Sequence, residues 1–225
     1  MKPNILYEDN HIIVAVKPQN VPSMPDASGD MDMLTAVKSY VKEKYGKPGE
    51  AFIGLVHRLD RPTGGLMVFA RTSKAAARLS KQFSEKTAVK EYLAVLRGSL
   101  PEKEGVLTSR LVKDEEENIT RVAGGEEGKT AQLEYKVLRE KEGMTLVRIR
   151  LLTGRGHQIR VQFAETGHPV VGDMKYGKNE KKGNLMLWAS HLEIEHPTKK
   201  ERMAFTSEPP DSGLWGEMIT ALSCP

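Results

Sequence analysis

The sequence predicts an α+β protein in which helices and loops flank a mixed, mainly antiparallel central sheet. Stretches with strand character far outnumber stretches with helical character, and the two kinds do not alternate regularly along the 225 residues. This order disfavours a doubly wound parallel sheet. The length suits one large mixed-sheet domain, and neither an internal repeat nor a long linker interrupts the chain. We therefore expect a single domain over residues 1–225.

Short strands and two helices are predicted in the first part of the chain. Strands are expected at residues 5–7, 12–16, 53–56 and 66–70, which are apolar and bounded by turn residues. Apolar residues recur at three- and four-residue spacing from Leu34 to Tyr45 and stop before Gly46, which predicts a helix. A second, surface helix is expected from Ser73 to about Phe83, capped by its first residue or by the threonine before it.

The rest of the chain is rich in strand candidates. These lie at residues 89–96, 106–111, 130–138, 144–152 and 185–194. In the fourth candidate Val147, Ile149 and Leu151 alternate with arginines, a pattern typical of a half-buried strand. Residues 114–117 and 124–128 are expected to be exposed turns. Helices are predicted at residues 157–166 and 214–222.

Composition excludes several classes of protein. The single cysteine, Cys224, cannot form an internal disulfide or a cysteine-ligated zinc site. The N-terminus lacks the apolar segment of a signal peptide, and no stretch approaches the ~20 apolar residues that span a bilayer. We therefore expect a cytoplasmic protein without membrane contact. The net charge of +4 permits nucleic-acid binding only through local clusters of basic residues.

A charged segment lies between two apolar strand candidates at residues 57–66, which read His-Arg-Leu-Asp-Arg-Pro-Thr-Gly-Gly-Leu. A carboxylate at the end of a buried strand loses hydration, so Asp60 must either be paired or shift its pKa. A purely structural loop, in which Asp60 caps or forms a local ion pair, is the alternative interpretation. Local composition alone favours that alternative.

A second segment, residues 152–161, reads Leu-Thr-Gly-Arg-Gly-His-Gln-Ile-Arg-Val. A strand ends here, a glycine-rich turn follows, and a helix is expected to begin with His157 and Arg160 in its first turn. Free amides at a helix N-terminus and an arginine fork both suit an anionic partner. The segment matches neither a Walker-type loop nor a dinucleotide-binding fingerprint.

Together the two segments resemble the HRLDxxTSGL and TGRxHQIR signatures of the RluA family of RNA pseudouridine synthases. Further matches follow in chain order as far as about Phe205: Leu6–Asp9, Val14–Pro18, Lys90–Val95, Gly167–Asp173, Tyr176–Gly177, Leu185–Ala189 and His196–Pro197. Departures from the family pattern occur at Gly64, Gly156, Gln162 and Trp188, and they suggest a divergent branch. The resemblance implies the pseudouridine synthase fold and the isomerisation of uridine to pseudouridine in RNA.

The resemblance also implies roles for individual residues. Asp60 would be the catalytic aspartate, Tyr92 would stack against the target base, and Arg160 would pair with the aspartate. Leu187 would form an apolar wall of the uracil pocket. Arg58 would fill the gap that the flipped nucleotide leaves. A carboxylate can act on a sugar as nucleophile or base, and a nearby cation keeps it ionised under a bound substrate.

Two further basic residues complete the predicted RNA contacts. Arg155 belongs to the second basic segment, and Lys17 follows an expected strand, where a lysine is usually only solvated. The reaction moves no electrons and activates no phosphate, so we expect neither cofactor nor metal, and the six histidines show no HxH or HExxH spacing. The expected partner is a stem-loop in ribosomal or transfer RNA, bound by a monomer without a separate N-terminal RNA-binding domain.

Two other functions remain open from the sequence. One is a non-catalytic RNA-binding or RNA-chaperone protein with the same fold, which the intact set of Asp60, Tyr92 and Arg160 disfavours. The other is a nucleic-acid hydrolase, which the lack of paired carboxylates or metal-ligand spacing disfavours.

Overall fold

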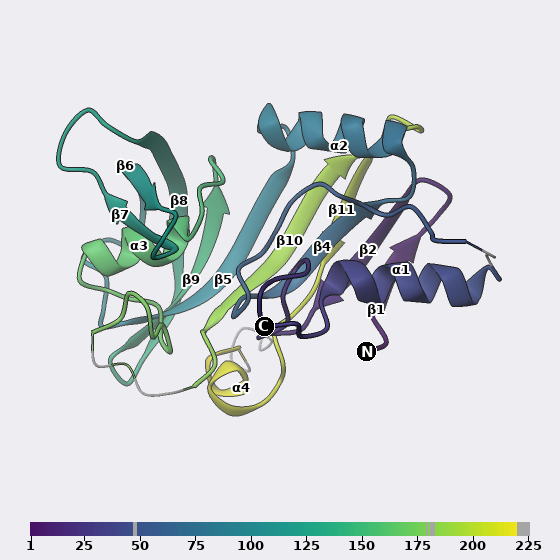
Figure 1. Ribbon diagram of the computed structural model, residues 1–225. Helices are drawn as coiled ribbons and strands as arrows, with labels where there is room; N and C mark the ends of the chain where they lie inside the picture. Colours follow the sequence, from purple (N-terminus) through teal and green to yellow (C-terminus); the bar gives the residue numbers. More distant parts are fainter. Residues whose placement is uncertain (47–48, 179, 181–182, 220–225) are drawn as a thin grey trace. The chain divides into compact units, whose positions relative to one another are not determined.

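The chain divides into two units in the computed structural model, which describes residues 1–46, 49–178, 180 and 183–219 (Figure 1). The first unit contains residues 1–90 and 189–207, and the second contains residues 91–188 and the segment that follows residue 207. Cys224 and the last three residues of the predicted C-terminal helix lie outside the described residues. The expectation of a single domain stays a prediction.

Antiparallel strands form the framework of the first unit. They are β1 (Asn4–Glu8), β2 (Ile12–Lys17), β3 (Gly54–Leu55), β4 (Gly64–Ala70), β10 (Leu187–Glu195) and β11 (Arg202–Thr206). Their order is β1-β2-β4-β10-β11, with β3 paired to β4. The first two residues of β10 belong to the second unit. The pairs β1–β2, β2–β4, β3–β4 and β10–β11 are antiparallel.

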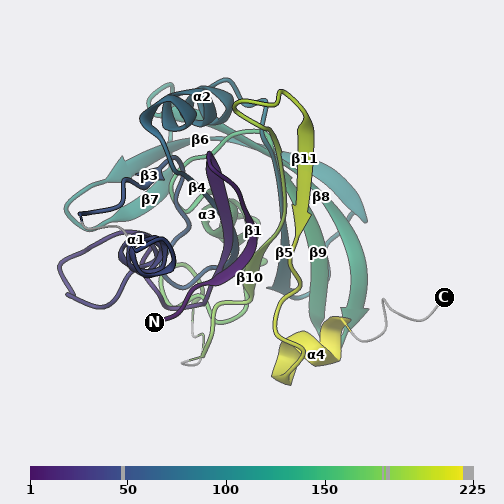
Figure 2. The ribbon, with the colours of Figure 1, turned by 90° about the vertical axis from the view of Figure 1, so that its right-hand side faces the viewer.

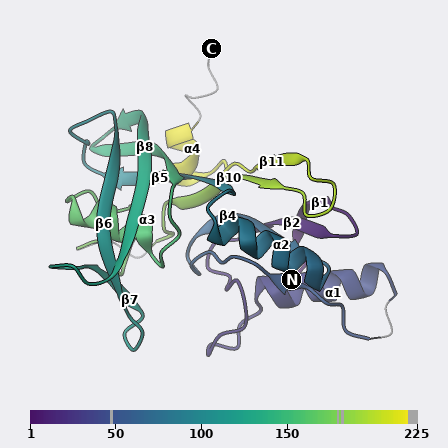
Figure 3. The ribbon, with the colours of Figure 1, turned by 90° about the horizontal axis from the view of Figure 1, so that it is seen from above.

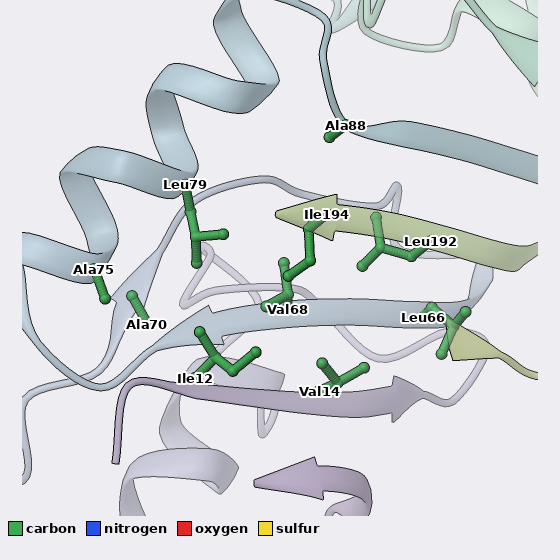
Figure 4. Close-up of a cluster of buried hydrophobic side chains, with 10 residues drawn as sticks. All are labelled: Ile12, Val14, Leu66, Val68, Ala70, Ala75, Leu79, Ala88, Leu192 and Ile194. Carbon is green, nitrogen blue, oxygen red and sulfur yellow. The ribbon is translucent and has the colours of Figure 1, made fainter. Parts of the chain in front are cut away.

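The core of the first unit lies between these strands and helix α2 (Ser73–Ser84). Because successive strand side chains point to opposite faces, every second residue of β2 and β4 faces α2. Figure 4 shows the buried cluster: Ile12, Val14, Leu66, Val68, Ala70, Ala75, Leu79, Ala88, Leu192 and Ile194. The Thr72 side chain caps α2 by accepting a hydrogen bond from the Ala75 amide at 3.1 Å, as the sequence predicted.

Helix α1 (Met33–Lys44) lies beside β1 in the first unit (Figure 1 and Figure 2). Its N-terminus is capped by Asp32, whose side chain accepts a hydrogen bond from the Thr35 amide at 2.9 Å. The Glu8 carboxylate of β1 accepts hydrogen bonds from Tyr40 and Lys44. These contacts tie the C-terminal half of α1 to β1.

A second antiparallel set of strands forms the second unit. It consists of β5 (Val89–Arg97), β6 (Glu104–Asp114), β7 (Ile119–Val122), β8 (Lys129–Lys141) and β9 (Met144–Leu151), in the order β5-β9-β8-β6-β7. The first two residues of β5 belong to the first unit. Helix α3 (Gln158–Glu165) packs against β6 and β7 (Figure 3). The side chains of Leu111, Ala131 and Val161 form a small core there. Helix α4 (Gly213–Ile219) follows near the end of the chain.

The predicted α+β class is confirmed, while several element boundaries differ from the prediction. Strands β7 and β11 were not predicted, and β3 contains two residues instead of four. His157 lies outside α3 with a left-handed backbone (φ 56°), so the helix begins one residue later than expected. In the part of the chain that the structure describes, no helix is long and apolar enough to cross a membrane.

Candidate active site

Asp60 lies in an irregular loop between β3 and β4 in the first unit. Residues 56–60 have no regular secondary structure. Solvent exposure differs between neighbouring residues of this loop: Arg58 is exposed, Leu59 is buried and Asp60 is partly exposed. The Thr63 amide donates to the Asp60 carbonyl oxygen at 3.0 Å and closes a tight turn.

A serine hydroxyl fixes the backbone immediately before Asp60. Ser23 Oγ donates to the Leu59 carbonyl at 2.8 Å and accepts from the Leu59 amide at 3.1 Å. Both residues are buried. In the same loop, Gln19 Nε2 donates to the Pro62 carbonyl at 3.2 Å. The segment after β2 therefore supplies the loop with hydrogen bonds that a strand would otherwise provide.

Lys17 is buried beneath this loop, and the expectation that it contacts RNA is corrected by its surroundings. The residue has 0% exposure, and its ammonium donates to the carbonyl oxygens of Pro18 at 3.0 Å, Val21 at 2.6 Å and Arg61 at 2.9 Å. Burial lowers the pKa of Lys17 to about 7, while the negative charge of Asp60 acts in the opposite direction. Three carbonyl acceptors account for all three donors of an ammonium, so Lys17 connects the Asp60 loop to the segment that follows β2.

His57, at the start of the same segment, anchors the loop in its neutral form. Its Nε2 accepts a hydrogen bond from the Val68 amide at 3.0 Å, and its ring stacks on Phe83 with the ring centroids 4.5 Å apart. Burial lowers the pKa of His57 to about 3, and a nearby Lys90 charge acts in the same direction. The residue as a whole is partly exposed, but the accepted amide bond independently requires an unprotonated Nε2.

A glycine behind the loop allows β4 to approach β10 closely. Gly65 has a φ of 115°, and a Cβ atom on it would lie 2.3 Å from the Ala189 carbonyl oxygen. The second glycine that ends the charged segment is therefore required by close packing and by backbone conformation.

Arg160, in the first turn of α3, lies in the second unit and forms a buried ion pair with Asp173. Its Nε lies 2.7 Å from Asp173 Oδ2 and its Nη2 lies 2.8 Å from Oδ1. The exposure of Arg160 is 5% and that of Asp173 is 1%. This bidentate geometry fixes one edge of the guanidinium. The expected pairing of Arg160 with Asp60 stays a prediction.

Asp173 and Tyr176 organise the surroundings of Arg160. Asp173 Oδ1 also accepts hydrogen bonds from the amides of Lys175 at 3.0 Å and Tyr176 at 3.1 Å. The guanidinium carbon of Arg160 lies 5.0 Å from the centre of the Tyr176 ring. The Tyr176 hydroxyl accepts from the Thr120 amide at 2.9 Å, and it lies 2.6 Å from His157 Nδ1. Strand β7 is therefore linked to the residue that precedes α3.

The glycine-rich turn before α3 is held by buried amide and hydroxyl groups. Gln158 Oε1 accepts from Thr153 Oγ1 at 2.7 Å and from the Arg155 amide at 3.1 Å. The Arg155 side chain is partly exposed, and its Nε donates to the Thr130 carbonyl at 3.0 Å. The turn therefore presents Arg155 from a rigid backbone.

Tyr92 and Leu187 are buried residues of the second unit. Tyr92 is 8% exposed in β5, where it is paired in register with Ile149 of β9. Leu187 is 3% exposed at the start of β10, next to Met186, whose carbonyl accepts from the Val95 amide at 3.0 Å. Their predicted roles against the target base stay predictions.

Three residues with clear structural roles at the candidate site were missed by sequence reasoning. Asp173 and Tyr176 stood in a run that carried the family resemblance, but no role was derived for them. The available signal was an acidic and an aromatic residue that follow the helix carrying Arg160 and could contact its guanidinium. Ser23 gave no signal, because its role depends on a contact 36 residues along the chain. Among the residues that the structure describes, no group of three or more His, Cys, Asp or Glu side chains is arranged to hold a metal ion.

Comparison with known proteins assigns the family. Residues 11–165 match the family model described as RNA pseudouridylate synthase. The chain belongs to the RNA pseudouridylate synthase family. It is 35% identical to the dual-specificity RNA pseudouridine synthase RluA of Yersinia pestis, over 91% of this chain and 98% of that protein. The predicted resemblance to the RluA family is therefore confirmed.

Two other similar proteins extend the comparison. The ribosomal large subunit pseudouridine synthase C of Vibrio parahaemolyticus is 32% identical over 88% of this chain, which spans 63% of that protein. The structure of human RNA pseudouridylate synthase domain containing 1 superposes with a TM-score of 0.75 and 26% identity, over 93% of this chain and 84% of that one. The predicted fold and the predicted class of enzyme, an isomerase that acts on RNA, are confirmed at the level of the family. These comparisons favour the enzyme over the non-catalytic RNA-binding protein.

Proposed function

We propose that this pseudouridine synthase isomerises uridine to pseudouridine in a structured ribosomal or transfer RNA, with Asp60 as its catalytic carboxylate. The observation that carries the proposal is the Asp60 loop, in which Asp60 is partly exposed while buried Ser23 and Lys17 fix the backbone on both sides of it. Catalysis benefits from a reactive group that is held in place before the substrate arrives. Relatives named for the ribosomal large subunit support ribosomal RNA as the substrate class.

The reaction itself requires only acid–base or nucleophilic chemistry. The Asp60 carboxylate acts on the ribose either as a nucleophile or as a base, and the bond between N1 of uracil and C1′ of ribose breaks. The uracil then turns, a bond forms between C5 and C1′, the hydrogen on C5 leaves as a proton, and the freed N1 takes up a proton. No electron is transferred, so the balance requires neither oxidant nor reductant.

Arg160 and Tyr92 act around this carboxylate in the proposal. A guanidinium that remains charged favours the ionised aspartate when bound RNA excludes water. The bidentate contact with Asp173 supports this role, because it gives Arg160 a defined orientation in the absence of RNA. Tyr92 would stack on the extruded uracil and replace part of the stacking that the base loses. Leu187 would contact the opposite, apolar side of the base.

RNA recognition is assigned to basic side chains that reach the surface. Arg58 would occupy the space that the flipped nucleotide leaves, offering its planar face to neighbouring bases, and Arg155 would contact the phosphate backbone. Flipping costs a few kcal/mol and costs least for an unpaired base, so a uridine in a stem-loop is the expected target. We propose that the protein acts as a monomer in the cytoplasm, where these RNAs are located.

The test is the release of tritium from C5 of labelled uracil in bulk ribosomal and transfer RNA. Asp60→Asn keeps the shape of the side chain but removes its nucleophilic and basic character, so turnover should fall by more than about 10³-fold. RNA affinity should change little. Glu50→Gln, which removes an exposed carboxylate of the same unit, is the control and should retain activity. Appreciable tritium release by Asp60→Asn would remove Asp60 from its role.

A further inference from the structure

The residue that follows the predicted catalytic aspartate, Arg61, has its side chain held by an exposed acidic turn. Nη1 donates to Ser28 Oγ at 2.9 Å and lies 3.6 Å from Asp26 Oδ2. Nη2 pairs with the carboxylate of Asp30. All three partners lie within five consecutive residues, so a single turn surrounds the guanidinium.

The acidic turn is built by its own hydrogen bonds. The amide of Ser28 donates to Asp26 Oδ1 at 2.9 Å, and the amide of Gly29 donates to the Asp26 carbonyl at 3.3 Å. Gly29 has a φ of 70°, a conformation that glycine adopts readily. Hydrogen bonds from Ser28, together with the nearby Arg61 charge, lower the pKa of Asp26. The Asp26 carboxylate is therefore ionised at neutral pH.

The backbone of Arg61 is rigid, although its side chain is accessible. Its carbonyl oxygen accepts a hydrogen bond from buried Lys17 at 2.9 Å, whereas the side chain is 42% exposed. A guanidinium that extends from a fixed backbone matches the geometry of a phosphate. Its present partners are exposed carboxylates, and exposed ion pairs contribute little to stability, so they are readily exchanged for another anion.

The same segment also contacts the other arginine of the catalytic loop. Arg58 Nη1 lies 3.8 Å from the sulfur of Met24. The segment from Met24 to Asp30 therefore contacts the arginine side chains on both sides of Asp60. An RNA strand that reached Asp60 would meet this segment.

We infer that Arg61 is a binding position for a phosphate of the RNA backbone and that the acidic turn occupies this position in the free protein. The carboxylates of Asp26 and Asp30 compete with the phosphate for the guanidinium. Binding of RNA then exchanges one set of anionic oxygen atoms for another and displaces the turn. The inference rests on the proposed function only for the identity of the ligand as RNA.

A double-mutant cycle tests the competition. The probe is a short RNA stem-loop with uridines in its loop, and its dissociation constant is measured by fluorescence anisotropy over a range of salt concentrations. The double variant Asp26→Asn/Asp30→Asn should bind about threefold to tenfold more tightly than the unmodified protein. Arg61→Ala should bind more weakly and lower the salt slope by about one.

The decisive measurement combines the three substitutions. If the carboxylates act by occupying Arg61, their removal should change the affinity by less than about twofold once Arg61→Ala is present. An equal gain in the presence and absence of Arg61 would overturn the inference, because it would show a general effect of charge. No gain in either background would overturn it as well. Asparagine keeps the oxygen that accepts from Ser28, so the turn should persist.

A matched control removes two exposed carboxylates elsewhere in the same unit. Glu85 and Glu195 have side-chain exposures of 55% and 42%, the same as Asp30 and Asp26, and they pair with Lys81 and Lys200. Glu85→Gln/Glu195→Gln should change the affinity by less than about twofold. A gain equal to that of the Asp26/Asp30 variant would contradict the inference.

The tritium-release assay on the same proteins separates this inference from the proposed function. One outcome is that the effects of the Arg61 and acidic-turn substitutions on RNA affinity are coupled while no cellular RNA releases tritium. This outcome would support phosphate binding at Arg61 and reject the proposed reaction. Tritium release by the unmodified protein without coupling would support the reaction and overturn the phosphate position.

Discussion

Two buried cations of the candidate site, Lys17 in the first unit and Arg160 in the second, are held in different ways. Lys17 of the first unit donates to three backbone carbonyl oxygens. Arg160 of the second unit is held by both oxygens of the Asp173 carboxylate. Carbonyl oxygens tie a cation to several points of the backbone, whereas a bidentate carboxylate also fixes the direction of a planar guanidinium. The first arrangement suits a clamp for a loop, and the second suits an oriented charge.

The difference also explains why lysine and arginine occupy these positions. Burial lowers the pKa of Lys17 to about 7, so its charge is only marginally retained at neutral pH. Arginine stays charged in proteins, and its planar fork matches a carboxylate with two parallel hydrogen bonds. A group that must keep an aspartate ionised during catalysis has to remain charged itself, and arginine meets this requirement.

The largest effect is expected when the carboxylate beside Arg160 is removed. Asp173→Asn removes the bidentate carboxylate from a buried guanidinium, so the free energy of unfolding should fall by about 3–5 kcal/mol. Urea unfolding measures this change. Glu193→Gln removes the partner of Arg202 in a more exposed ion pair, where both nitrogens contact one carboxylate oxygen, and should cost less than about 1 kcal/mol. Similar losses for both variants would contradict the distinction between buried and exposed pairs.

Lys17→Met is expected to have the next largest effect. The substitution keeps an unbranched side chain but leaves three carbonyl oxygens without their donor, so the free energy of unfolding should fall by about 2–3 kcal/mol. Because the Asp60 loop loses its clamp, kcat should fall more than KM rises. The control is Lys2→Met, at an exposed lysine. A variant of Lys17 with normal kcat but weaker RNA binding would instead support the original expectation of an RNA contact.

A smaller effect is expected from the serine that fixes Leu59. Ser23→Ala removes a donor and an acceptor from one buried residue, so the free energy of unfolding should fall by about 1–2 kcal/mol. Thermal unfolding measures the loss. Ser84→Ala, at an exposed serine that donates to the Lys81 carbonyl, should cost less than about 0.5 kcal/mol. Equal losses at the two serines would show that the loop does not depend on Ser23.

The pH dependence of stability provides the finest test of the first unit. The pKa of His57 is about 3 in the folded protein against 6.5 as its ordinary value, so only the unfolded chain gains a proton as the pH falls below about 6.5. Stability is therefore lost progressively between pH 6.5 and pH 3, by about 1–2 kcal/mol between pH 7.5 and pH 5. Asp9, with a pKa of about 2, loses its contribution only below about pH 3.8 and does not affect the interval from pH 7.5 to pH 5.

His57→Gln checks this assignment. Its amide oxygen can accept the Val68 hydrogen bond but does not titrate, so the variant should be less stable at pH 7.5 and show a flatter loss toward pH 5. Urea unfolding at several pH values measures the slope. An unchanged slope would show that His57 is not the group responsible.

The successes and failures of the sequence-based prediction of the fold have physical reasons. Regular apolar spacing located α1, and alternation with arginines located β9, because both patterns arise from the direction of side chains along a single element. Residue composition located α2. Strand β7 was missed because its four residues lie between acidic and glycine-rich turns. Strand β11 was missed because it contains polar residues and is defined by its pairing with β10.

The sequence by itself determined the family, the α+β class and the two segments that carry Asp60 and Arg160, because these properties depend on residue types at short spacing. The tertiary structure alone decided that Lys17 clamps a loop, that Asp173 holds Arg160 and that an acidic turn covers Arg61. Each of these contacts joins residues at least 13 positions apart, up to 44. Contacts between such distant residues depend on the tertiary fold. Local periodicity predicts single helices and strands but not which distant residues meet.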